Sequence, residues 1–262
     1  MEPDVAQVVE DSSLPDSPQK PQAWGFWETL GLTFIIVLAQ LVIDLVVGAV
    51  FAAVYMARSP NLSTADVAIL LSSNGLYVSV ATAVTAPAIA GLCVMFAWLR
   101  RGMPVRDYFG LTKPSLRVFL FWVGLAAAFA PASDTLRYAI GQNTLSRFTI
   151  DAYQSAVFVP LLWVAFIVMA PMWEEIVFRG FLFTGIQQSR VGSAGAVLVT
   201  ATLWAGLHLQ YNLCGILTVL VLGLLLGMAR LQSGSIVPCI VMHGVNNLIA
   251  TVEVAVYVYL NR

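Results

Sequence analysis

The sequence predicts an all-α fold, a polytopic membrane bundle of about seven transmembrane helices, and three observations support that class. Of the 262 residues, 59% are hydrophobic and only 10% are charged, whereas a soluble globular domain carries roughly 25% charged residues. Apolar runs recur along the chain at the length of about 20 residues that a helix needs to cross a membrane. The few ionisable residues inside those runs are grouped, which indicates a polar interior.

Seven apolar runs come after an N-terminal segment of different composition. They lie near residues 29–57, 74–99, 117–133, 155–188, 194–210, 213–231 and 236–260. The fourth run exceeds one crossing and contains Pro160 and Pro171, so we expect a kink or a separate short helix before the main one, which would make eight spans. Residues 25–262 are therefore expected to form a single transmembrane helical domain.

The first 24 residues carry Asp, Glu, Ser and Pro without hydrophobic periodicity. Such a segment cannot bury enough apolar surface to fold. We expect residues 1–24 to form a disordered cytoplasmic tail.

Lys and Arg are distributed unequally when alternate loops are assigned to the same face. One face receives Lys20, Arg100, Arg101, Arg106, Lys113, Arg117, Arg190 and Arg230, and the other receives Arg58, Arg137, Arg147 and Arg262. Because cytoplasmic loops carry the excess of these residues, we expect the N-terminus and the 100–117 loop in the cytoplasm, in an integral protein of the cytoplasmic (inner) membrane.

The distribution of charge indicates whether membrane lipids or nucleic acid are expected as partners. The 100–117 loop mixes cations with Tyr108, Phe109 and Leu111, which would lie in the headgroup region against anionic membrane lipids or serve only as a topology signal. The net charge of −1 leaves no basic surface that could follow a phosphate backbone, so no nucleic-acid partner is expected.

Small residues suggest packing instead of chemistry at two places. Cys93, Cys214 and Cys239 fall in apolar stretches without CxxC spacing, which is typical of packed hydrophobic residues. Gly223 and Gly227 form a GxxxG pattern, which favours close helix packing.

Ionisable residues inside the spans are the strongest sequence signal, because each charged side chain costs at least about 2.5 to 3.5 kcal/mol on insertion scales and so requires a partner or a function. They are Asp44, Glu174, Glu175, Arg179, His208, His243 and Glu253. No other ionisable residue of the same span lies close to Asp44 or to Glu253 in the sequence. We therefore expect an interhelical polar contact for Asp44 and an interfacial position for Glu253.

The two adjacent acids should differ in environment. Glu175 and Arg179 are four residues apart, hence on one helix face, with the acid on the N-terminal side that favours pairing. Glu174 is rotated by about 100° from Glu175 on a helix. One acid can then be neutralised by Arg179, while the other faces a cavity.

Both histidines of the chain fall inside predicted spans. Histidine is suited to proton transfer near neutral pH, or to metal ligation as neutral imidazole. His243 and Asn247 are four residues apart, so one helix face offers two groups that can donate hydrogen bonds to a developing oxyanion. Trp204 precedes His208 by one turn and can form a wall that excludes water.

These clusters occur in a characteristic order: EExxxR at 174–179, an aromatic residue one helical turn before His at 204–208, and HxxxN at 243–247. In this order they resemble the CAAX protease and bacteriocin-processing family, also called the Abi family, which includes the Ras-converting type II CAAX prenyl endopeptidases. The resemblance covers about residues 155–260. The second motif of the family usually begins with Phe, and Trp204 stands there instead, so the pocket shape should differ.

The resemblance implies an intramembrane endopeptidase that hydrolyses a peptide bond near the membrane, with its catalytic core in 155–260. Glu174, with His208, would activate a water molecule, and His243 and Asn247 would bind the oxyanion. Supporting residues would be Glu175, Arg179 and Trp204. The substrate would be a peptide or a C-terminal protein segment, with or without an attached lipid.

Two alternatives stay open at this point. A zinc-dependent version of the same protease would use Glu174, His208 and His243 as ligands, a recognised set with water in the fourth position; HExxH is absent, and we expect no cofactor. A non-catalytic membrane scaffold or bacteriocin-immunity protein would bind a peptide or lipid in the same pocket, since fold does not fix function.

Overall fold

The computed structural model describes residues 22–261, and the described part is all-α, as predicted. The tail predicted for residues 1–24 falls almost entirely outside the described residues. Of its last three residues, Ala23 is buried and its N–H donates to Gln188 Oε1 at 2.7 Å, while Trp24 Nε1 donates to the Phe96 carbonyl at 2.9 Å. The chain therefore enters its first helix already fixed to the bundle.

Six helices are long and apolar enough to cross a membrane. They are α1 (Phe26–Arg58), α3 (Gly75–Leu99), α5 (Leu116–Ala139), the continuous helix Val159–Gln187, α11 (Leu213–Ser233) and α12 (Val237–Leu260). The continuous helix comprises α7 (Val159–Val164), η1 (Ala165–Met169), α8 (Ala170–Glu175), η2 (Ile176–Leu182) and α9 (Phe183–Gln187). Shorter helices are α2 (Thr64–Ser72), α4 (Val105–Tyr108), α6 (Arg147–Gln154) and α10 (Gly192–Gly206).

The predicted count of seven spans differs from the structure at the run 194–210. That run folds as α10, which has 15 residues and is only about 22 Å long at 1.5 Å per residue. This is shorter than a hydrocarbon core of about 30 Å. The fourth run, near residues 155–188, folds as the single continuous helix Val159–Gln187, so the separate short helix that would have made an eighth span is not formed within it.

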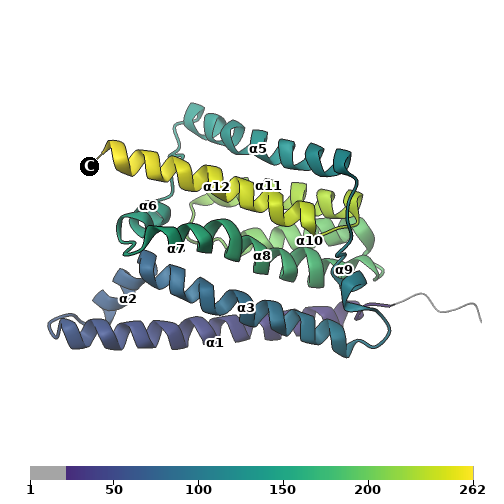
Figure 1. Cartoon of the computed structure of the whole chain (residues 1–262), viewed down its shortest axis with the longest axis horizontal. Coiled ribbons are helices and arrows are strands. Elements are labelled where there is room, and N and C mark those ends of the chain that lie inside the picture. Colours follow the sequence, from purple (N-terminus) through teal and green to yellow (C-terminus); the bar gives the residue numbers. More distant parts are fainter. Residues whose placement is uncertain (1–21, 262) are drawn as a thin grey trace, which may run out of the picture.

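The helices run side by side along the long axis of the molecule, so their connections gather at two ends (Figure 1). We call one the basic end, made by segments 100–115, 188–191 and 234–236. There Thr184 Oγ1 donates to the Tyr108 carbonyl at 2.8 Å, and the Ile236 N–H donates to the Gly110 carbonyl at 3.2 Å.

We call the other the opposite end, made by segments 59–63, 140–158 and 207–212. The Gly75 N–H donates to Ser155 Oγ at 2.9 Å, and Asn212 Nδ2 donates to Gln142 Oε1 at 3.4 Å. These bonds connect the start of α3 with the segment after α6, and the 207–212 turn with the segment before α6.

The basic end is closed by aromatic packing. Tyr108 and Phe109 are 0% and 2% exposed, and the Tyr108 ring stacks on Phe181 with ring centroids 5.4 Å apart. Gly180 makes room for Phe109, whose ring carbon would lie 2.5 Å from a Cβ there. Burial raises the pKa of the Tyr108 hydroxyl to about 12. The expectation that Tyr108 and Phe109 contact lipid headgroups was wrong, because they fill the bundle instead.

The GxxxG pattern brings α10 and α11 together. A Cβ at Gly223 would lie 3.2 Å from Ala201 Cα, and one at Gly227 would lie 3.3 Å from Val197 Cα. The glycines thus allow the two backbones to approach closely, as the pattern predicts. The cysteines Cys93, Cys214 and Cys239 are all free, and Cys93 and Cys239 are buried among apolar side chains.

Candidate active site

Two π-helical segments, η1 and η2, flank the short helix that ends with Glu174 and Glu175. Pro171 lacks the N–H that would bond the Ile167 carbonyl one turn before it. Helix α12 covers this irregular stretch: Gly244 lies so close that a Cβ would be 2.9 Å from the Ile167 oxygen, and Asn247 Nδ2 donates to the Phe166 carbonyl at 2.9 Å. Such π segments frequently occur at functional sites.

Glu175 belongs to a fully buried ionic cluster. Its Oε1 accepts a hydrogen bond from Arg179 Nη1 at 3.0 Å and lies 3.0 Å from His243 Nδ1. Both Glu175 and Arg179 are 0% exposed. The ion pair indicated by the spacing of four is therefore present, and its carboxylate also fixes the His243 ring.

Arg179 is held from three sides. Besides Glu175, its guanidinium donates to the Gly223 carbonyl at 3.1 Å and lies over the Trp204 ring, 4.6 Å from the centroid. Because it is fully buried and does not line the cavity next to Glu174, it offers no contact for a substrate carboxylate.

Glu174 points away from that cluster. Its Oε2 accepts a hydrogen bond from Trp204 Nε1 at 2.6 Å, and the residue is half-buried at the wall of a cavity. The two acids thus occupy different environments, as their rotation around the helix indicates. Trp204 lines the pocket and also donates the hydrogen bond to Glu174. A Phe at this position would have no N–H to donate.

His208 lies just after α10, in the 207–212 turn, and not within a span as predicted. Its Nδ1 is 2.8 Å from the Trp204 carbonyl. A carbonyl only accepts, so Nδ1 carries the proton, and in the neutral ring Nε2 is left as an acceptor. The His208 ring also stacks on Tyr211, with centroids 5.8 Å apart.

A cavity of about 500 Å³ gathers these side chains. Its lining includes Glu174, Trp204, His208, His243 and Asn247, which the sequence singled out, whereas Glu175 and Arg179 lie behind the wall. Trp204 contacts both imidazoles edge-on, with centroids 4.9 Å from His208 and 5.1 Å from His243. The arrangement offers a carboxylate, two imidazoles and a carboxamide to one cavity.

Sequence reasoning missed several residues of this lining. Gln40 and Asp44 come from α1, Tyr211 from the turn after α10, and Asn246 from α12. Asp44 does make the interhelical contact expected of it, since its Oδ1 accepts from Thr85 Oγ1 at 2.9 Å. Two of these residues could have been found from the sequence. Asn246 directly precedes Asn247, and Tyr211 lies three residues after His208.

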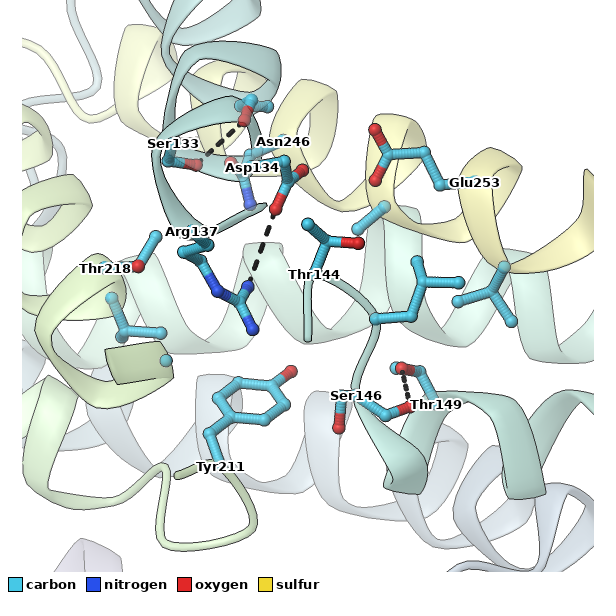
Figure 2. A pocket seen from close by; sticks show the side chains of 16 residues that line it. Ser133, Asp134, Arg137, Thr144, Ser146, Thr149, Tyr211, Thr218, Asn246 and Glu253 are labelled. Carbon is cyan, nitrogen blue, oxygen red and sulfur yellow. Dashed lines mark hydrogen bonds and ion pairs between the residues drawn. The ribbon is translucent and has the colours of Figure 1, made fainter. Parts of the chain in front are cut away.

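A second, smaller cavity of about 130 Å³ adjoins the first and shares Thr149, Tyr211 and Asn246 with its lining. Asp134 and Arg137 form an ion pair at 3.5 Å there, and Figure 2 shows Glu253 on the facing helix. Glu253 thus lines a polar chamber inside the opposite end, together with residues from α5.

A zinc site would require Glu174, His208 and His243 to converge on one ion. Within residues 22–261, no three His, Cys, Asp or Glu side chains gather closely enough to hold a metal ion. Glu174, His208 and His243 as placed do not fit a zinc ligand set.

Comparison with known proteins gives one finding. The family model described as type II CAAX prenyl endopeptidase Rce1-like matches residues 156–249, a range that contains every site residue predicted from the sequence. No curated protein and no solved structure matches the chain. The protein is therefore an integral membrane protein whose residues 156–249 are similar to the Rce1-like family of membrane proteases, consistent with the CAAX protease and bacteriocin-processing family.

Proposed function

We propose that the protein is an intramembrane endopeptidase in which Glu174 activates the water that hydrolyses a peptide bond. The observation that carries the proposal is the separation of the two acids. Glu175 is paired with Arg179 and His243 in the core, whereas Glu174 lies at the cavity wall with the Trp204 indole as its hydrogen-bond donor. A carboxylate at a cavity wall, within reach of a bound water, is a suitable general base.

In the first step, Glu174 takes a proton from a water molecule whose other hydrogen is accepted by His208 Nε2. The water oxygen bonds to the carbonyl carbon, and the carbonyl π electrons move onto its oxygen. When the tetrahedral intermediate collapses, the C–N bond breaks and the proton on Glu174 passes to the leaving nitrogen. The products are a carboxylic acid and an amine.

Asn247 and His243 would stabilise the oxyanion. Asn247 donates one N–H to the Phe166 carbonyl, which leaves its second N–H for the substrate. His243 Nδ1 is held by Glu175 Oε1 at 3.0 Å, and the ring would donate to the oxyanion from Nε2, which requires a proton on that nitrogen. Removing one oxyanion donor costs about 10² to 10³ in rate in other hydrolases.

We further propose that no metal takes part, supported by the spread of the donors: within residues 22–261 no three His, Cys, Asp or Glu side chains lie closely enough together to hold a metal ion. Elemental analysis of the purified protein checks this. We expect substoichiometric zinc and unchanged cleavage after chelation; stoichiometric zinc with loss on chelation and recovery on zinc addition would contradict it.

The main test compares peptide termini in membrane fractions from cells with the wild type and with Glu174→Ala. General acid–base catalysis contributes about 10² to 10⁴ in rate, so termini produced by the wild type should disappear in the variant. Glu28→Ala is the matched control, because Glu28 is an exposed acid at the start of α1. Identical termini in the wild type and Glu174→Ala, both folded, would favour the non-catalytic scaffold.

A further inference from the structure

Arg230 is a buried cation whose hydrogen-bond partners are not acids. The distribution of Lys and Arg placed it in a loop, but it lies inside α11, is 6% exposed, and packs over the Phe183 ring, 5.5 Å from the centroid. None of the ion pairs formed within residues 22–261 includes Arg230. A buried charge without a counter-charge is costly, so its hydrogen bonds indicate what it does.

The guanidinium of Arg230 binds the main chain of the candidate active site. Its Nε donates to the Arg179 carbonyl at 3.0 Å, and its Nη2 lies 3.4 Å from Thr184 Oγ1. That carbonyl belongs to the π-helical segment η2. The bond therefore fixes the irregular turn that carries the Arg179 side chain.

Helix α11 holds Arg179 at two points. The Gly223 carbonyl accepts from Arg179 Nη2 at 3.1 Å, and Arg230 donates to the Arg179 main chain. Gly223 and Arg230 are seven residues apart, which is about two turns of helix, so both contacts come from one face of α11. One helix thus fixes both the backbone and the guanidinium of Arg179.

Arg179 transmits this position to the cavity by two routes. Its Nη1 donates at 3.0 Å to Glu175 Oε1, the atom that also holds His243 Nδ1. Its guanidinium lies 4.6 Å from the centroid of the Trp204 ring, whose N–H donates to Glu174. A shift of Arg179 would therefore move side chains that line the cavity.

We propose that Arg230 is a positioning residue of the candidate active site, which sets the placement of the Arg179 guanidinium. Arg230 is not among the residues that line the cavity, so it acts on the site through Arg179. That this placement serves peptide hydrolysis rests on the proposed function. A misplacement of about 1 Å can cost about 10²-fold in rate, so loss of this contact should be visible in kcat.

The first test is Arg230→Lys. Lysine keeps the charge but lacks the planar fork, so it cannot reproduce both hydrogen bonds. With a synthetic peptide that spans a cleavage site lost in Glu174→Ala, kcat should fall by about 10- to 10²-fold. KM should not change, because Arg230 does not line the cavity. An unchanged kcat in the folded variant would overturn the proposal.

Two further variants separate positioning from general stability. Gln232→Ala removes the acceptor for Trp122 Nε1, a 2.6 Å contact between α11 and α5, and should lower thermal stability in detergent without changing kcat. Arg230→Gln removes the uncompensated buried charge and should lower kcat without a comparable loss of stability. Equal losses of kcat in Gln232→Ala and Arg230→Lys would refute the proposal, because the effect would then come from the packing of α11.

A readout without cleavage uses the histidines, of which the chain has two. In protein with isotope-labelled histidine, nuclear magnetic resonance should show that Arg230→Lys moves the imidazole signals of His243, whose Nδ1 is held by Glu175. Gln232→Ala should leave these signals in place. Unmoved His243 signals in Arg230→Lys would contradict the proposal. If Glu174→Ala leaves every peptide terminus unchanged, the proposed function fails, and the His243 signals still decide the role of Arg230.

Discussion

The two ends of the bundle are built from the same apolar helices, yet one is filled and the other is hollow. At the basic end, aromatic rings from α4 and η2 pack against one another around Gly180. At the opposite end, α10 is short and two adjoining cavities take the space. The difference shows that the polar residues inside this membrane protein fall into two sets, one that is buried in the packed core and one that lines the cavities.

The sharpest test of that division is the pair Glu174→Gln and Glu175→Gln. Glu174→Gln should reduce cleavage by about 10² to 10⁴, since a general base is lost, with little change in thermal stability. Glu175→Gln should destabilise the fold by about 3 to 5 kcal/mol, because Arg179 is left buried without its counter-charge. Cleavage assays and thermal unfolding in detergent measure both, and equal stability losses would break the comparison.

The glycines of the two ends provide the next test. Gly180→Ala should destabilise the protein by about 1 to 3 kcal/mol, as overpacking does, because the added Cβ would lie 2.5 Å from the Phe109 ring. At Gly206 a Cβ meets nothing within 4 Å. Gly206→Ala should therefore be neutral or slightly stabilising in thermal unfolding. A larger loss for Gly206→Ala would show that the opposite end is the more tightly packed one.

Trp204→Phe should lower cleavage by about tenfold while folding is retained. The variant keeps the aromatic ring but removes the N–H that donates to Glu174, and a hydrogen bond to a charged group contributes about 1.5 to 3 kcal/mol. The loss should appear in kcat and not in KM, since the bond orients the base. Trp204→Leu, which also removes the ring packed on Arg179, is the control expected to lose stability as well.

The smallest effect is expected at α2, an exposed helix of the opposite end. Ser63 and Asp66 form a capping box, and the hydrogen bonds from Ser63 hold the Asp66 pKa below its ordinary value of 3.8. A lowered pKa means that this stabilisation is present above the ordinary value and is lost as pH falls through the folded value. Amide exchange in α2 should therefore be faster in Asp66→Asn than in the wild type at neutral pH, and the two should converge in acid.

Much of the site could be predicted because ionisable side chains are costly in a membrane. That cost singled out Glu174, Glu175, Arg179, His208 and His243, and the helical rotation between the two acids indicated their separation. The fold class could be predicted from composition and from the length of the apolar runs.

Other features depend on contacts between segments that are distant in the sequence, and the spacing of residues along the chain does not predict such contacts. Gln40 and Asp44 reach the cavity from α1, more than a hundred residues before Glu174. The length of α10 was overestimated because the apolar run continues past the end of the helix, through Leu207 and Leu209 in the turn that holds His208. One of the two interpretations of the 100–117 loop placed Tyr108 and Phe109 at the membrane surface because their neighbours in sequence are cations, while their neighbours in space are Phe181 and Gly180.

The contact of α12 with the irregular stretch around Phe166 and Ile167 has a consequence for how the sequence can vary. Gly244 and Asn247 align α12 with the helix that carries Glu174. A single residue inserted between Cys239 and His243 would rotate the later part of α12 by about 100° relative to its first turn. Either His243 would leave Glu175, or the start of α12 would leave the basic end. Insertions should therefore be tolerated in the segment before α6 and not near the start of α12.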